Sequence, residues 1–335
     1  MKKILCLFIL FTTVAFCQLQ FSSISSAPGA FSRMGFGARG IGMGNAMSAV
    51  IEGNLVSYYN PAISVFQDKS VFQTSYSVLS LDRHLNFINV TTRFDLHPYG
   101  EDSYEDKSIN PVSSAGISFG LINAGVSNIS ERDGSGIETG TLSTSENQIF
   151  LSFAKTFSSK LAVGIATKFY IYNLVYGLKA SGLGFDIGVL YKLNDNFNIA
   201  GVLSDINSKY KWDSTTLLGQ DGKTTEDSFP LLKKIGISYR NNEYKILASA
   251  ELENSNFGTN ILRFGVEYNI YDQVYIRGGI DNFNLSNSDF PKRPALGFSY
   301  FKSLGGNWII GVDYAFVIEQ YSPDNSHIIG VNVRF

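Results

Sequence analysis

Two short glycine motifs in the sequence match patterns that carry chemistry in enzymes. Gly35-Phe-Gly-Ala-Arg-Gly40 matches the dinucleotide-binding pattern GxGxxG, and Gly116-Ile-Ser118-Phe-Gly120 matches the GxSxG pattern around a nucleophilic serine. The first needs a βαβ unit with an acidic partner, and the second needs a strand-to-helix turn. The sequence provides neither context, because strand and helix patterns do not alternate and Ser118 falls inside a strand pattern. We assign neither motif a function.

Histidine and cysteine, which many metal and hydrolase sites need, are scarce in this chain. The three histidines, His84, His97 and His327, fall at the edges of predicted loops, and no two of them have metal-ligand spacing. The two cysteines, Cys6 and Cys17, lie in an N-terminal segment that we expect to be removed. We therefore predict a protein that is not an enzyme and that has no metal site and no cofactor.

Charged residues recur instead at alternate positions of apolar segments. In 183–193, Leu183, Phe185 and Ile187 point one way, and Asp186 and Lys192 point the other. A helical period would place Asp186 among the leucines, so the period of two predicts strands. About 14 segments of this kind, most of 10 to 14 residues, follow one another between 69 and 335.

These strands are long, their polar face is rich in glycine, and aromatic residues gather near the strand ends, as in the girdles of membrane barrels. We predict an all-β outer-membrane barrel of about 14 antiparallel strands over 69–335. A secreted β-sandwich is the alternative, since alternation alone does not show which face of the strands is exposed to water.

A charge on the lipid side of such a barrel costs ~2–4 kcal/mol at mid-bilayer, so charged residues in the strands are expected to face the lumen. Two roles are open for them: a mixed-sign network that solvates the lumen and fixes a plug, or a lining that selects solutes. The residues are Lys168, Asp186, Lys192, Arg263, Glu267, Arg277, Asp281 and Asp313.

The composition agrees with a lipid-facing barrel and excludes other classes. Only 17% of residues are charged while 14% are aromatic, and Lys plus Arg total 27 against 29 Asp plus Glu, a net charge of −2. Without a basic surplus, no nucleic-acid partner is expected. Beyond the first 17 residues, no apolar run approaches the ~20 residues of a membrane-spanning helix.

The N-terminus has the pattern of a secretory signal peptide. Lys2 and Lys3 precede an apolar stretch from Ile4 to Ala15, and Ala15 and Cys17 stand at the −3 and −1 positions before Gln18. We predict a signal peptide over 1–17, cleaved after Cys17. A lipoprotein with Cys17 acylated is the alternative.

The predicted connections alternate between tight turns and longer loops, such as 131–144 and 208–229. If the tight turns are periplasmic, the C-terminus ends in the periplasm. The charged stretch 96–111 breaks this rule, because its place in the order demands a short turn.

The segment 18–68 lacks alternation and is predicted to be a compact plug, or hatch, inside the barrel. Its glycine run permits close backbone approach and positive φ. Asn60 suits a helix N-cap and Pro61 suits the first helical position, so a short helix should reach about Phe66. We expect Arg39 of the hatch to pair with Asp186 or Asp313.

Part of this segment resembles the N-terminal signature of the PorV/PorQ family, within the larger FadL-like group of outer-membrane proteins. The matching residues are Gly37-Ala38-Arg39-Gly40-Ile41-Gly42-Met43-Gly44-Asn45-Ala46 and Tyr59-Asn60-Pro61-Ala62. The resemblance implies a 14-stranded barrel with an N-terminal hatch in the lumen. Val331-Asn332-Val333-Arg334-Phe335 also resembles the C-terminal signal read by the barrel assembly machinery, with Ile329, Val331, Val333 and Phe335 as its apolar positions.

The resemblance implies one of two functions. PorV-like members act in type IX secretion and hold cargo proteins at the cell surface, and we rank this role first. FadL-type members pass hydrophobic small molecules inward by diffusion, which would require an apolar pocket beside the hatch and an opening in the wall. Such a pocket would be lined by Phe31, Met34, Phe36, Ile41, Met43 and Met47, which would otherwise form the core of the hatch. The expected partners are outer-membrane lipid, the barrel assembly machinery and either secretion components with their cargo or hydrophobic molecules.

Overall fold

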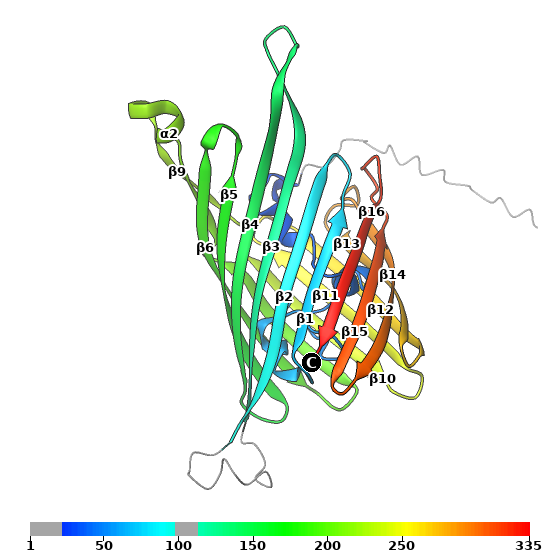
Figure 1. Ribbon diagram of the computed structural model, residues 1–335. Coiled ribbons are helices and arrows are strands. Elements are labelled where there is room, and N and C mark those ends of the chain that lie inside the picture. Colours follow the sequence, from blue (N-terminus) through cyan, green and yellow to red (C-terminus); the bar gives the residue numbers. More distant parts are fainter. Residues whose placement is uncertain (1–21, 98–112) are drawn as a thin grey trace, which may run out of the picture.

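Fourteen antiparallel strands close into a barrel in the computed structural model, which describes residues 22–97 and 113–335 (Figure 1). Each strand pairs with its neighbours in the chain, and the last strand pairs with the first from Val71↔Arg334 to Val78↔His327. The barrel strands are β1 (Val71–Val78), β2 (Arg83–Leu96), β3 (Ser113–Arg132), β4 (Glu138–Thr156), β5 (Leu161–Asn173), β6 (Lys179–Lys192), β7 (Phe197–Ile206), β10 (Leu232–Asn241), β11 (Ile246–Ser255), β12 (Asn260–Tyr271), β13 (Val274–Asn284), β14 (Arg293–Gly305), β15 (Trp308–Val317) and β16 (Ser326–Arg334).

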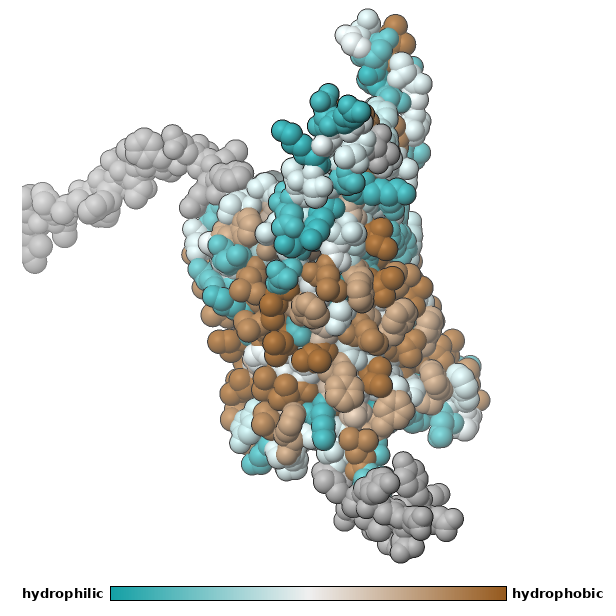
Figure 2. Space-filling view, turned by 90° about the vertical axis from the view of Figure 1, so that its left-hand side faces the viewer, coloured by the Kyte–Doolittle hydropathy of each residue, from teal (hydrophilic) through white to brown (hydrophobic). Residues whose placement is uncertain are grey.

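The apolar residues of the strands face outward. On β6, Leu183, Phe185 and Ile187 are each about 40% exposed, whereas Asp186 between them is 1% exposed. Figure 2 shows the result on one side of the molecule as a broad hydrophobic band across the body of the barrel, with polar residues above it. A sandwich would bury this face, so the barrel prediction is confirmed and the sandwich alternative is wrong. No helix within the described ranges is long and apolar enough to cross a membrane.

The two ends of the barrel differ. At the end where the C-terminus lies, which we call the turn end, the described connections are the tight turns 157–160, 193–196, 242–245, 272–273 and 306–307. At the opposite loop end, the β3–β4 hairpin rises above the other strands (Figure 1). The predicted signal peptide at 1–17 and most of the stretch 96–111 lie outside the described residues.

Two predicted loops at the loop end contain regular structure. The loop expected at 131–144 is largely strand, because β3 and β4 stay paired as far as Arg132↔Glu138. The loop expected at 208–229 contains a hairpin of β8 (Lys209–Asp213) and β9 (Thr224–Ser228), with the short helix α2 (Thr215–Leu218) between them. β8 pairs with the start of β6 and thus extends the wall beyond the barrel. The strand ends within 131–144 are mostly polar, and β8 alternates Tyr210 and Trp212 with charged residues over only five positions, so neither segment gives a long hydrophobic alternation.

The segment 22–68 lies inside the barrel. It contains the 3₁₀ helices Ser23–Ser26, Ala30–Arg33 and Pro61–Phe66 and the single helical turn α1 (Ala38–Gly42). The helix expected after Asn60 is confirmed: the Asn60 side chain accepts a hydrogen bond from the Ala62 backbone N–H at 2.9 Å, and Pro61 occupies the first position. We call 22–68 the hatch from here on.

Candidate functional site

The hatch backbone lies directly against the barrel wall at inward-facing glycines. A Cβ atom on Gly265 would stand 2.3 Å from the Met43 carbonyl oxygen, and one on Gly279 would stand 2.2 Å from the Gly44 nitrogen. Gly44 itself has φ +58° and no room for a side chain against the backbone of Ile280. The same close approach occurs at Gly116 and Gly164, which meet the hatch backbone near the turn end. These wall glycines therefore allow the hatch backbone to pack directly on the wall, and we call them the glycine seats. The contact of Gly265 and Gly279 with Met43 and Gly44 is called the Met43–Gly44 seat.

Arg39 is the main ionic contact between hatch and wall. Its guanidinium binds Glu267 of β12 through two parallel hydrogen bonds of 2.9 and 2.8 Å, and it also donates to the carbonyl oxygens of Glu52 and Asn54. Glu267 is shared with Arg277 of β13 at 3.1 Å. Burial acts to lower the pKa of Arg39, but the nearby Glu267 carboxylate outweighs it and the net pKa is raised, so Arg39 stays charged.

Arg39 does not pair with Asp186 or Asp313, so both predicted partners are wrong. Asp313 accepts hydrogen bonds from the Ser299 hydroxyl and the Asn332 amide instead. Asp186 belongs to a different group, where it pairs with Lys168 at 2.7 Å. Alternation had placed both carboxylates on the inner face correctly, but it carries no information on their position around the barrel.

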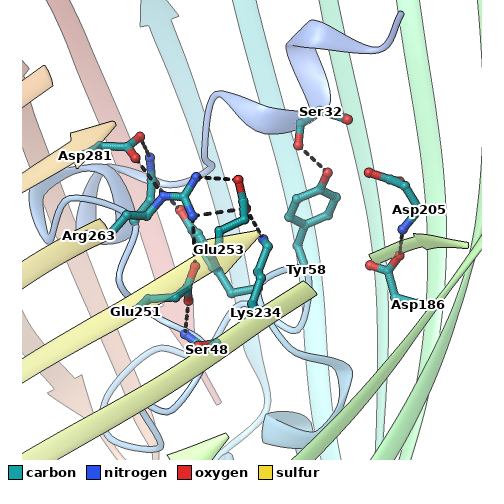
Figure 3. Close-up of polar contacts among 12 residues, drawn as sticks. Ser32, Ser48, Tyr58, Asp186, Asp205, Lys234, Glu251, Glu253, Arg263 and Asp281 are labelled. Carbon is teal, nitrogen blue, oxygen red and sulfur yellow. Dashed lines mark hydrogen bonds and ion pairs between the residues drawn. The ribbon is translucent and has the colours of Figure 1, made fainter. Parts of the chain in front are cut away.

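A second ionic group surrounds Arg263 of β12 (Figure 3). Arg263 pairs with Glu251 at 3.1 Å, Glu253 at 3.0 Å and Asp281 at 2.7 Å, and all four side chains are at most 6% exposed. The hatch joins this group, because Asn45 donates to Asp281 at 2.8 Å and the Ser48 backbone N–H points at Glu251. This group therefore fixes the middle of the hatch to β11, β12 and β13.

The third group lies on the other side of the hatch. Lys168 of β5 pairs with Asp186 at 2.7 Å and with Asp205 at 3.2 Å, and its ammonium stands 4.6 Å from the centre of the Tyr58 ring. Tyr58 donates a hydrogen bond to the Ser32 carbonyl within the hatch (Figure 3). Lys192, the remaining predicted lumen charge, is half-buried at the turn end and lies over the ring of Phe66 at 4.4 Å.

Tyr59 holds the signature segment of the hatch together. Its hydroxyl lies 2.7 Å from the Asn45 side-chain oxygen and 3.0 Å from the Phe36 carbonyl, and it accepts a bond from the Phe36 backbone N–H at 2.9 Å. Burial raises the pKa of the Tyr59 phenol well above its usual value, so it remains a neutral donor. The motif residues Gly37, Ala38 and Gly40 lead into and form α1 around this anchor.

The residues predicted to line a hydrophobic pocket are packed together in this structure. Phe31, Phe36, Met43 and Met47 are at most 5% exposed and belong to one apolar cluster with Tyr58 and Phe87, and Met34 packs against it. Ile41 belongs to a separate cluster against β14, β15 and β16. The space that Met47 borders measures only about 10 Å³, too small for a ligand. In this state these side chains form the core of the hatch.

An apolar groove lies on the outer surface, on the far side of the wall from the Met43–Gly44 seat. Its volume is about 470 Å³, and Phe264, Ile280, Leu296, Phe316 and Ile318 line it, with Gly265, Gly278 and Gly279 in its floor. The wall is irregular beside it, because Asp281 and Asn282 of β13 together stand opposite Arg263, and Asn282 has φ +61°. Such a bulge bends the strand and interrupts its pairing.

Comparison with solved structures finds outer-membrane barrels with a similar fold. The Pseudomonas putida toluene transporter TodX superimposes with a TM-score of 0.56 at 15% identity, over 89% of this chain and 96% of that one. The Ralstonia pickettii toluene transporter TbuX gives 0.55 at 14% identity, over 90% and 98% of the two chains, and a Pseudomonas aeruginosa FadL homologue gives 0.53 at 10%, over 88% and 97%.

The chain has the FadL-type barrel fold. At these identities the likeness establishes the fold alone. No family model matches the sequence, and no curated protein does. The PorV/PorQ assignment therefore stays a prediction, while its wider FadL-like grouping agrees in fold with the solved structures.

Several members of the ionic groups are not among the charged residues predicted from the sequence to face the lumen. Glu251 and Glu253 alternate with Leu252 on β11 and were detectable by the same parity that indicated Arg263. Asp205 was not detectable, because it follows the buried Ser204 directly and has φ +60°, which breaks the alternation. Among the described residues, no cluster of three or more His, Cys, Asp or Glu side chains could hold a metal ion.

Proposed function

We propose that this chain is a passive channel for hydrophobic small molecules in the bacterial outer membrane, without catalytic function. The observation that carries the proposal is the apolar groove at the Met43–Gly44 seat, where only the wall backbone separates the packed hatch core from the lipid side. The shared fold with two toluene transporters supports it.

The position of the groove suits a hydrophobic substrate better than a route straight down the lumen. The hatch core and the three ionic groups occupy the middle of the barrel, and the cavity beneath them at the turn end is polar. Moving a hydrophobic molecule from an apolar environment into such a polar space is unfavourable. A path through the wall lets the substrate move between the hatch core and the membrane without hydration. The bulge at Asp281–Asn282 is where the strand pairing next to this path is already interrupted.

The proposal predicts that filling the groove blocks transport while the barrel remains folded. Gly278 points into the groove, where an added Cβ would make only an ordinary 3.5 Å contact with Leu296. Gly278→Leu should therefore fold and obstruct the groove. Gly201, an outward-facing glycine of β7 with no atoms within 4 Å of an added Cβ, offers the matched control Gly201→Leu.

The assay is uptake of radiolabelled toluene by Gram-negative cells that lack a channel of this type. Expression of the chain should raise the uptake rate, Gly201→Leu should preserve the increase, and Gly278→Leu should remove most of it. Equal uptake by both variants would exclude the groove as the route. Uptake no faster than in cells without the protein would refute the transport function.

The β8–β9 hairpin favours a second candidate, the role in type IX secretion. All five residues of β9 are exposed, and its outer edge pairs with no other strand of the described chain. A free strand edge can accept an extended segment of another protein. Pull-down from a host with the type IX machinery tests this role: cargo proteins should co-purify with the intact chain and be lost when 209–228 are replaced by a short Gly-Ser linker. No cargo with the intact chain would reject it.

A further inference from the structure

A large cavity opens at the turn end of the barrel, beneath the hatch. Its volume is about 560 Å³, and the hatch borders it with the segment 51–54 and with Phe66 and Asp68. The rest of the lining comes from strand residues near this end of the barrel and from the 242–245 and 272–273 turns. Its innermost part is the Arg39–Glu267–Arg277 group described above.

This cavity is strongly basic, in contrast to the chain as a whole. Among the described residues that border it, seven are Arg or Lys and four are Asp or Glu, although the whole chain carries a net charge of −2. Glu267 is shared by Arg39 and Arg277, Lys245 pairs with Asp272 at 3.2 Å, and Arg93 pairs with Asp95 at 2.7 Å. Arg240 comes only within 4.0 Å of Glu52, and Arg334 and Lys192 form no ion pair within the described residues. The surplus positive charge of the cavity therefore rests on Arg334, Lys192 and Arg240.

Arg277 is a buried lining residue whose hydrogen-bonding capacity is not fully used. Its side chain is 1% exposed, and its Nη2 donates to the Ser299 hydroxyl at 2.5 Å, whereas its buried Nη1 has no hydrogen-bond partner in the described structure. A buried guanidinium N–H without an acceptor carries the full cost of desolvation. Nη1 is itself shielded from the cavity, so an anion there would contact it only after the Arg277 side chain moves.

Arg334 near the end of β16 presents a second incompletely satisfied guanidinium. Its Nε donates to the Asn54 side chain of the hatch, and its plane lies 5.0 Å from the centre of the Phe301 ring. Its two Nη groups have no hydrogen bond within the described residues. Because the stacking on Phe301 and the bond to Asn54 fix its orientation, the free edge is preorganised for a ligand.

From these observations we propose that the cavity binds a small oxyanion or an oxyanionic head group, carboxylate or phosphate. Both groups match the planar fork of a guanidinium and form two parallel charge-assisted hydrogen bonds with it. Arg334 would hold the ligand with its free edge, while Arg277 behind the inner wall and Arg240 and Lys192 in the lining supply further positive charge. This site does not depend on the transport proposal, since a free anion in the periplasm would occupy it as well.

The test is isothermal titration of the purified full chain in a nonionic detergent at low salt. Three probes distinguish the source of the anion: inorganic phosphate, octanoate and the neutral octan-1-ol. Octanoate or phosphate should bind and octan-1-ol should not bind at this site. Tighter binding of octanoate assigns the head group of an amphiphile, and tighter binding of phosphate assigns the free anion.

Arg334→Gln should weaken binding of the preferred anion at least tenfold, or ~1.4 kcal/mol. Lys302→Gln is the matched control, because Lys302 lies on β14 at the same end of the barrel but does not border the cavity. Arg240→Gln, at a half-exposed side chain on the cavity rim, repeats the test if Arg334→Gln does not fold. The proposal is overturned if neither anion binds, or if binding to the arginine variants equals binding to Lys302→Gln.

Discussion

Replacing Arg39 with glutamine should loosen the hatch without unfolding the barrel. Arg39 makes two hydrogen bonds to Glu267 and two to hatch carbonyls, and a glutamine side chain is too short to keep the bidentate contact. Glu267 would still be paired with Arg277, so the variant does not leave an isolated buried carboxylate. The loss is thus expected at the lower end of the ~3–5 kcal/mol for breaking a buried pair completely.

The magnitude follows from the bonds that disappear. A hydrogen bond to a charged group contributes about 1.5–3 kcal/mol, and the two bonds to Glu267 act as one bidentate unit, so we expect a loss of ~3 kcal/mol in the free energy of hatch opening. That loss corresponds to a roughly 100-fold larger population of the open hatch. Since the contact joins the hatch to one side of the wall, the strand pairing should be unaffected.

Native-state hydrogen exchange measures this effect directly. Backbone amides of 36–56 should exchange roughly 100-fold faster in Arg39→Gln, while those of the barrel strands keep their protection. Arg33→Gln is the control, because Arg33 binds only hatch carbonyls, those of Pro28, Ile24 and Ala27. Unchanged exchange in Arg39→Gln, or an equal increase in both variants, would refute the assignment of Arg39 as the tie between hatch and wall.

Three further perturbations test other parts of the structure. Gly279→Ala places a Cβ about 2.2 Å from the Gly44 nitrogen, so the hatch should become sensitive to protease while the barrel keeps its compact gel mobility. Lys168→Met leaves two buried carboxylates without their cation and should lower the free energy of unfolding by ~3–5 kcal/mol, measured by urea titration in detergent. The hydroxyl and backbone N–H of Thr215 hold the pKa of Asp213 below its usual value. Because the folded pKa is the lower one, this contact stabilises the β8–β9 connection above about pH 4, and the protection of its amides, relative to their intrinsic exchange rate at each pH, should fall as the pH falls further. An Asp213→Asn variant with the same pH response would contradict this assignment.

Much of the barrel could be predicted because its constraint is repeated at every strand. Lipid on one side and a packed hatch on the other force the same alternation, so parity identified the strands and placed residues such as Asp186 and Arg263 on the inner face. The positions of the tight turns followed from the gaps between alternating segments.

The partner of each inward charge could not be predicted in the same way. Parity gives the face of a residue but not its height or its position around the barrel, and these depend on the stagger of all strands together. The predicted inner face contains four carboxylates, Asp186, Glu267, Asp281 and Asp313, and only the folded register brings Arg39 to Glu267. The bulge at Asp281–Asn282 and the kink at Asp205 have no signal in hydrophobicity, since both arise from single residues with positive φ.

The seam between β1 and β16 has a consequence for biogenesis. The strand made last closes the cylinder against the strand made first, and the hatch precedes that first strand by only a few residues. Arg39, Asn45 and Ser48 tie the hatch to three different strands of the closed barrel, β12, β13 and β11. We therefore expect the wall to close around a hatch that is already in place, with the wall glycines guiding the strands during assembly as well as holding the hatch afterwards.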